Sequence, residues 1–114
     1  MLTLEDENRY TAALTNSGFF GPDSWYMNGP ANMAYAARAQ PRLAMPALFV
    51  HAAYDYVCET LDSALAEPMR AHRADLTEAT VESGHWMAQE KPAEVNAALA
   101  KWLTTRLPDL WPRS

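Results

Sequence analysis

The sequence predicts an α/β fold built around a short parallel sheet that this chain leaves incomplete. The short apolar run 45–50 is bounded by turn-like residues and is typical of a strand buried on both faces of a parallel sheet, and 76–81 predicts a second short strand. The segment 60–70 between them has a helical pattern, and a further helix is expected to begin at Pro92. The order strand–helix–strand–helix over 43–107 therefore predicts a βαβ unit with a covering helix.

Helices, and no clear strand, are expected in the first forty residues. Thr3 and Asp6 have the spacing of a capping pair at a helix N-terminus, although such pairs more often use Glu at the second position. They predict a helix over 3–16, which Gly18 is suited to end.

Two shorter helices are expected to follow. The segment 21–24, Gly-Pro-Asp-Ser, predicts a turn that caps a helix through Trp25 and Tyr26. The sequence Asn-Gly-Pro at 28–30 should break that helix early, and the alanine-rich segment 31–38 predicts another one.

A change of pattern at 40–42 marks the expected boundary between two parts of the chain, 1–42 and 43–114. Two parallel strands alone do not make a stable sheet in water. We therefore expect 43–114 to be the end of a larger sheet, or to fold only against a partner.

The last helix is expected to be amphipathic. Apolar side chains recur along one helix face at the i, i+3, i+4, i+7 and i+8 spacing: Val95, Ala98, Leu99, Trp102 and Leu103. Such a stripe should pack against the sheet.

The composition predicts a cytoplasmic globular protein, because 49% of the residues are hydrophobic, 20% are charged and no secretory signal is visible. The formal charge of −5 gives no electrostatic reason to bind nucleic acid or an anionic membrane. No apolar run approaches the roughly 18 residues of a membrane span. The single cysteine, Cys58, is expected to be a small apolar filler at the start of a helix.

An acid and a histidine follow the two predicted strands. Asp55 lies five residues past Val50, and His85 lies four residues past Val81. Loops that leave neighbouring parallel strands emerge at one edge of the sheet, about 4.8 Å apart, so these side chains can form a hydrogen bond. A carboxylate beside an imidazole fixes its tautomer and makes the histidine a general base. Alone, either residue is more often a turn or surface residue, and the pattern by itself leaves both interpretations open.

Three segments resemble soluble epoxide hydrolases of the α/β-hydrolase superfamily. Ser83-Gly84-His85-Trp86, followed by Glu-Lys-Pro-Ala-Glu-Val-Asn at 90–96, resembles their histidine loop and final helix. The run 46–50 with Asp55 resembles their preceding strand and acid loop, and 17–26 resembles a segment of their cap domain. The resemblance implies that 1–42 is the C-terminal part of a helical cap domain. It also implies that 43–114 is the C-terminal part of the hydrolase core.

The resemblance also implies roles for individual residues. In that family an aspartate nucleophile opens the epoxide to form an alkyl ester, and two cap tyrosines hydrogen-bond the epoxide oxygen. The histidine, paired with an acid, then activates water to hydrolyse the ester. Tyr26 matches one cap tyrosine, Asp55 the acid and His85 the base. Without the resemblance, Tyr26 is more simply an interface aromatic.

Further residues are expected near a small-molecule epoxide. Trp25, Trp86 and Tyr54 are candidates for the substrate pocket, with packing as the alternative interpretation. We expect no cofactor and no metal, because His51 and His72 have no ligand-like spacing to each other or to His85.

The nucleophile of this fold is missing from the sequence. It sits in a Gly-x-nucleophile-x-Gly turn, but no two glycines here are four residues apart. We therefore expect the chain alone to be inactive and its partner to be the N-terminal part of the hydrolase or a second copy. Two alternatives stay open. One is another α/β-hydrolase, such as a haloalkane dehalogenase or an esterase. The other is a non-catalytic, self-associating truncated module.

Overall fold

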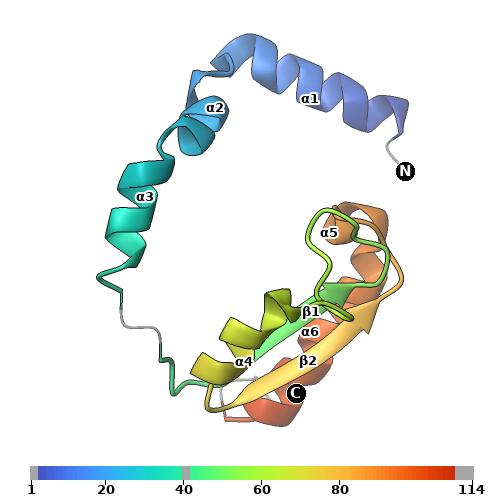
Figure 1. The fold of residues 1–114 in the computed structure, drawn as a ribbon. Coiled ribbons are helices and arrows are strands. Elements are labelled where there is room, and N and C mark those ends of the chain that lie inside the picture. The colour runs from blue at the N-terminus through green and yellow to red at the C-terminus, as the bar shows by residue number, and fades with distance from the viewer. Residues whose placement is uncertain (1–2, 40–41, 110–114) are drawn as a thin grey trace. The chain divides into compact units, whose positions relative to one another are not determined.

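The computed structural model describes residues 3–39 and 42–109, which form two compact units, Met1–Gln40 and Pro41–Ser114. The first contains three helices, α1 (Leu4–Ser17), α2 (Phe20–Met27) and α3 (Gly29–Ala36) (Figure 1). No residue of these three helices is buried, so the described part of this unit has no core of its own.

Helix α1 begins with the predicted capping pair of Thr3 and Asp6. The Thr3 hydroxyl accepts a hydrogen bond from the Asp6 N–H at 3.2 Å, and the Asp6 carboxylate accepts one from the Thr3 N–H at 2.9 Å. This satisfies two of the N–H groups that a helix N-terminus leaves unpaired. Gly18 ends the helix with φ 70°, a left-handed conformation that favours glycine.

The turn predicted at 21–24 is wrong, because this segment lies inside α2. Pro22 is tolerated there because the first N–H groups of a helix have no acceptor within the helix. The helix break predicted at 28–30 is confirmed, because α2 ends at Met27 and α3 begins at Gly29, with Pro30 in its first turn. The break between α2 and α3 is confined to Asn28.

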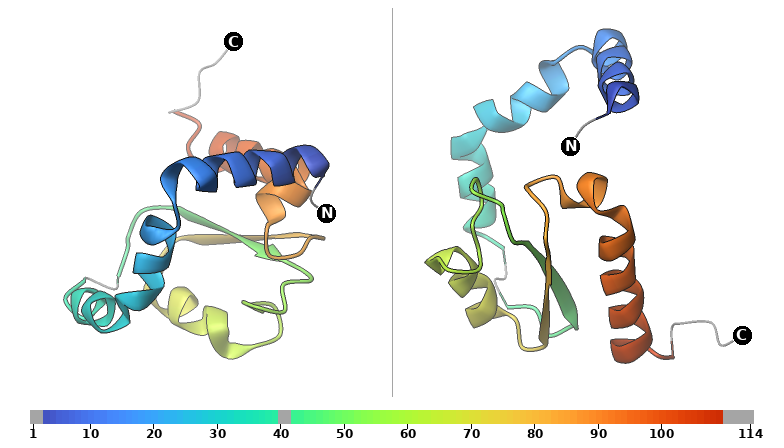
Figure 2. Two further views of the ribbon diagram at one scale, coloured as in Figure 1. Left: turned by 90° about the horizontal axis from the view of Figure 1, so that it is seen from above. Right: turned by 90° about the vertical axis from the view of Figure 1, so that its right-hand side faces the viewer.

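The second unit contains the predicted strand–helix–strand–helix order. Strands β1 (Ala47–Ala52) and β2 (Leu76–Val81) pair in parallel, with Ala47 opposite Leu76 and Ala52 opposite Val81. Helix α4 (Glu67–His72) lies on one face of this sheet and α6 (Pro92–Arg106) on the other, as the right-hand view of Figure 2 shows. A short helix, α5 (Met87–Glu90), follows β2 and leads into α6.

Two elements differ in their bounds from the prediction. Strand β1 runs two residues further than the predicted 45–50 and includes His51 and Ala52. The helix predicted over 60–70 is reduced to a single 3₁₀ turn, η1 (Ala64–Ala66), and α4. The carboxylate of Glu59 accepts hydrogen bonds from the N–H groups of Leu61 and Asp62, so this segment folds as a turn.

The core of the second unit is small. Among the described residues, the buried apolar side chains are Ala52, Ala66 and Val81, and the buried polar ones are His51, Asp55 and Ser83. The strands are buried at their carboxyl ends but not along both faces, because Glu78 and Thr80 are exposed. Helix α6 contacts both strands, as its apolar stripe predicted, although Leu99 on that stripe remains 44% exposed. The described residues therefore form a two-stranded parallel sheet with helices, an incomplete α/β arrangement.

Candidate active site

The loops that follow β1 and β2 leave the sheet side by side. Beyond the strands, the N–H of Ala53 donates to the carbonyl of Val81 at 2.9 Å, and the N–H of Tyr54 donates to the carbonyl of Ser83 at 3.0 Å. These bonds extend the parallel pairing into the loops. They bring Asp55 and His85, thirty residues apart in sequence, into contact.

Both carboxylate oxygens of Asp55 accept hydrogen bonds. Oδ1 accepts from the backbone N–H groups of Cys58 at 2.9 Å and Val57 at 3.0 Å, and Oδ2 lies 2.9 Å from His85 Nδ1. The Asp55 side chain is only 10% exposed. The Cys58 N–H, His85 and the Val57 N–H together hold the pKa of Asp55 below its ordinary value, although burial opposes them. Asp55 is therefore ionised at neutral pH and is held rigidly beside the imidazole.

The His85 ring is hydrogen-bonded to Asp55 through Nδ1, and its side chain is partly exposed. An ionised Asp55 can only accept, so Nδ1 donates to it and Nε2 carries the basic lone pair of the neutral ring. The side chain is 42% exposed, and its ring lies edge-on to Trp86 with 5.3 Å between the centroids. This geometry suits a general base that takes a proton from water.

A carboxylate from α5 supports the histidine loop. The N–H of Gly84 donates to Glu90 Oε2 at 3.1 Å. A β-carbon at position 84 would lie 3.0 Å from Glu90 Oε1, so glycine allows this close approach. Glu90 had no role in the sequence prediction. The only signal was its place six residues after Gly84, within the segments that resemble epoxide hydrolases.

His51 belongs to a separate polar network. Its side chain is 2% exposed; Nδ1 lies 2.8 Å from Thr60 Oγ1, and Nε2 lies 2.9 Å from Glu78 Oε1. Glu78 also accepts hydrogen bonds from Arg70 of α4. Arg70 first, and His51 second, hold the pKa of Glu78 below its ordinary value. The network joins the sheet, α4 and the loop that begins at Asp55, and the histidine spacing in the sequence gave no sign of it.

The other predicted site residues are mostly exposed. Trp86 (68% exposed) and Tyr54 (53%) lie in the two loops that carry His85 and Asp55. Trp25 and Tyr26 lie on α2 in the first unit, and both are exposed. The prediction for Cys58 is wrong, because it is an exposed, free cysteine in a bend of the acid loop. The turn formed around the Asp55 carboxylate places it there.

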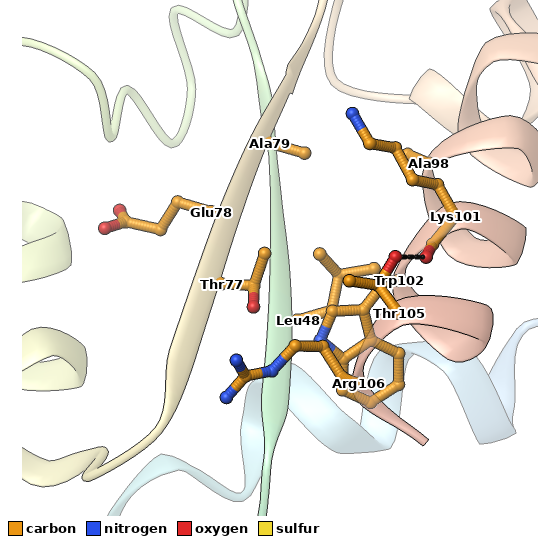
Figure 3. A pocket seen from close by; sticks show the side chains of 9 residues that line it. All are labelled: Leu48, Thr77, Glu78, Ala79, Ala98, Lys101, Trp102, Thr105 and Arg106. Carbon is orange, nitrogen blue, oxygen red and sulfur yellow. Dashed lines mark hydrogen bonds between the residues drawn. The ribbon is translucent and has the colours of Figure 1, made fainter. Parts of the chain in front are cut away.

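A cavity of about 280 Å³ lies elsewhere, between the sheet and α6 (Figure 3). Thr77, Ala79 and Leu48 line its sheet side, while Glu78 points away from α6. Across from them, α6 contributes Trp102, whose Nε1 has no hydrogen-bond partner in the described chain. None of the lining residues belongs to the loops of Asp55 and His85, so the cavity is no part of the acid–histidine site.

A membrane-spanning helix is absent from the described residues, where no helix combines sufficient length with sufficient apolar character.

Comparison with known proteins gives relatives that include epoxide hydrolases of a mammal and of a bacterium. Over 113 residues, 93% of this chain, the sequence is 38% identical to the bifunctional epoxide hydrolase 2 of Rattus norvegicus, of which the match covers 19%. It is 33% identical over 106 residues, 90% of the chain, to epoxide hydrolase A of Mycobacterium tuberculosis, of which the match covers 32%. No family model and no solved structure matches the chain.

The chain spans about a fifth to a third of the length of these curated relatives. The matches include nearly all of both units, and the relatives come from a mammal and a bacterium. The homologues of this chain over about nine tenths of its length are epoxide hydrolases, and the chain corresponds to one part of those enzymes.

Proposed function

We propose that this chain is the C-terminal part of an epoxide hydrolase with an α/β-hydrolase fold, and that it supplies the acid, the general base and one cap tyrosine. The observation that carries the proposal is the hydrogen bond between Asp55 Oδ2 and His85 Nδ1 at the carboxyl edge of a parallel sheet. Ligands of open α/β sheets bind at this edge. The names of the relatives add the reaction class.

In the proposed reaction, a carboxylate nucleophile from outside this sequence attacks an epoxide carbon. The carbon–oxygen bond breaks, the departing oxygen takes a proton from the phenol O–H of Tyr26, and a hydroxyalkyl ester of the enzyme remains. His85 Nε2 then takes a proton from water while the resulting hydroxide attacks the ester carbonyl. The vicinal diol leaves with the proton from His85. Asp55 stabilises the imidazolium between these two transfers. The tyrosinate recovers its proton from the carboxylic acid that hydrolysis of the ester leaves on the nucleophile.

The nucleophile must come from a polypeptide that carries the rest of the hydrolase, because no Gly-x-nucleophile-x-Gly turn exists in this sequence. Exposure of large apolar side chains supports the need for such a partner. Tyr26 is 81% exposed and Trp86 68%, and no large side chain among the described residues is fully buried. A second copy of the chain would cover apolar surface as well, but would bring no nucleophile.

The substrate we propose is a small epoxide with an apolar substituent. Trp86 and Tyr54 stand in the loops of the acid–histidine pair, where they can form an apolar wall. Trp25 neighbours Tyr26 on α2 and is proposed to contribute from the cap. No observation favours a dehalogenase or an esterase over an epoxide hydrolase.

Reconstitution tests the proposal. The chain is mixed with the remaining, nucleophile-bearing part of epoxide hydrolase A, and styrene oxide is added. We expect no diol from the chain alone and sustained diol formation from the mixture. His85→Ala should stop turnover after one equivalent, with the alkyl ester visible by intact mass. His72→Ala, a matched change at an exposed histidine of α4, should behave like the unmodified chain.

Three outcomes would contradict the proposal. One is turnover by the chain alone, with no longer polypeptide present. Another is a His85→Ala mixture that hydrolyses the ester at the unmodified rate. The third is a stable complex that forms neither ester nor diol.

A further inference from the structure

We propose that Asp55, Cys58 and His85 form a binding site for a thiophilic divalent cation such as Zn²⁺, and that the bound cation blocks the acid–histidine pair. One possible ligand atom from each side chain lies within 4.8 Å of the others. The set offers sulfur, imidazole nitrogen and carboxylate oxygen, the three donor types that zinc takes in proteins.

The backbone holds two of these residues in a fixed relation. The N–H of Cys58 donates to Asp55 Oδ1 at 2.9 Å, so the turn that orients the carboxylate also places the thiol beside it. The second N–H bond to Oδ1, from Val57, keeps that oxygen occupied. Oδ2 is the oxygen that faces His85, and it is the one available to a cation.

Only small movements are needed to close the site. Bond lengths of about 2.0–2.3 Å place neighbouring ligands of a tetrahedral zinc roughly 3.5 Å apart. The possible ligand atoms of the three side chains, which lie within 4.8 Å of one another, must therefore come closer together by about 1 Å. Cys58 and His85 are both exposed, so rotation of their side chains can supply this movement while buried Asp55 stays in place. Water would complete the four ligands.

The charges and protons balance. A thiolate and a carboxylate neutralise the divalent cation, and the thiol proton is released to solvent. If Nδ1 of His85 binds the cation, the neutral ring carries its proton on Nε2 and cannot accept another from water. If Nε2 binds, the basic atom is itself occupied. Either mode removes the function proposed for His85.

Cation binding does not depend on the epoxide hydrolase proposal, because it concerns the chain itself, whereas the blocking of His85 rests on that proposal. The probe is Co²⁺ titrated into the full chain under reducing conditions, followed by displacement with Zn²⁺. We expect one Co²⁺ per chain, a thiolate-to-cobalt charge-transfer band in the near ultraviolet, and a shift of the His85 ring resonances. Loss of a thiolate ligand in Cys58→Ser should abolish the band and weaken binding about 100-fold.

Two controls keep the result interpretable. His72→Ala, at an exposed histidine outside the cluster, should bind Co²⁺ like the unmodified chain. Far-ultraviolet circular dichroism should show that Cys58→Ser keeps the secondary structure. The inference is overturned if the chain shows no thiolate–cobalt band, if Cys58→Ser binds as tightly as the unmodified chain, or if His85→Ala leaves the affinity unchanged. Co²⁺ binding without any epoxide turnover by the reconstituted mixture would support the metal site and remove only the hydrolase proposal.

Discussion

Glu90 of α5 holds the loop of His85 through the backbone N–H of Gly84, at 3.1 Å. The contact connects the first turn after β2 with the helix that follows it. His85 lies next to Gly84, so the position of the imidazole against Asp55 depends on a carboxylate five residues further along the chain.

Removal of this carboxylate should disturb the position of His85. In the reconstituted mixture, Glu90→Ala should slow ester hydrolysis about tenfold, the size expected when a supporting hydrogen bond is lost. Ester formation should be unaffected, because Glu90 holds the loop of His85, which acts in the hydrolysis step. Glu90→Gln should restore most of the rate, since an amide oxygen can still accept from Gly84. Single-turnover kinetics separate the two steps, and an equal loss in both would show that Glu90 serves folding alone.

The second prediction concerns the three hydrogen bonds accepted by Asp55. An asparagine has one accepting atom in place of two, so Asp55→Asn cannot keep both the backbone bonds and the bond to His85 Nδ1. The imidazole then loses its fixed tautomer, and hydrolysis of the ester should fall by about 10³-fold or more. Diol release is the measurement. A fall of less than about tenfold would mean that Asp55 is not the partner that orients the base.

Prediction from sequence succeeded where the pattern is local or follows from strand pairing. The strand at 76–81 and the Thr3–Asp6 capping pair were predicted and are present. The contact between Asp55 and His85 was predicted because parallel neighbours carry their following loops to one edge.

Prediction failed where a side chain competes with the backbone for hydrogen bonds. The carboxylate of Glu59 turned a predicted helix into a turn, and the carboxylate of Asp55 drew Cys58 into an exposed bend. The buried bond from His51 to Glu78 joins positions 27 residues apart. Such pairings depend on strand register and on rotamers, which periodicity does not encode.

The third prediction is a loss of stability in acid. The pKa values of Asp55 and Glu78 are lower in the folded chain than their ordinary values of about 3.9 and 4.3. The unfolded chain therefore binds more protons in this range. The stability from these groups is present above about pH 4.3 and is lost as the pH falls through the folded pKa values. Urea midpoints measured from about pH 6 to pH 2 should decrease accordingly, and less steeply for Glu78→Gln. If the urea midpoint falls equally steeply with pH in the Glu78→Gln variant and in the unmodified chain, Glu78 does not contribute to the loss of stability in acid.

The last prediction concerns the buried imidazole of His51, whose two nitrogens contact Thr60 and Glu78. The His51→Leu substitution keeps much of the side-chain volume, but it removes the hydrogen-bond partner of the Thr60 hydroxyl and one of the partners of Glu78. The free energy of unfolding should therefore fall by about 2 kcal/mol. His72→Leu, at an exposed position, should change stability by less than about 0.5 kcal/mol. If His51 anchors the loop through Thr60, Thr60→Val should destabilise the unmodified chain more than the His51→Leu chain, by about 1 kcal/mol. Additive effects in chemical denaturation would show that the two side chains act independently and that the acid loop has another anchor.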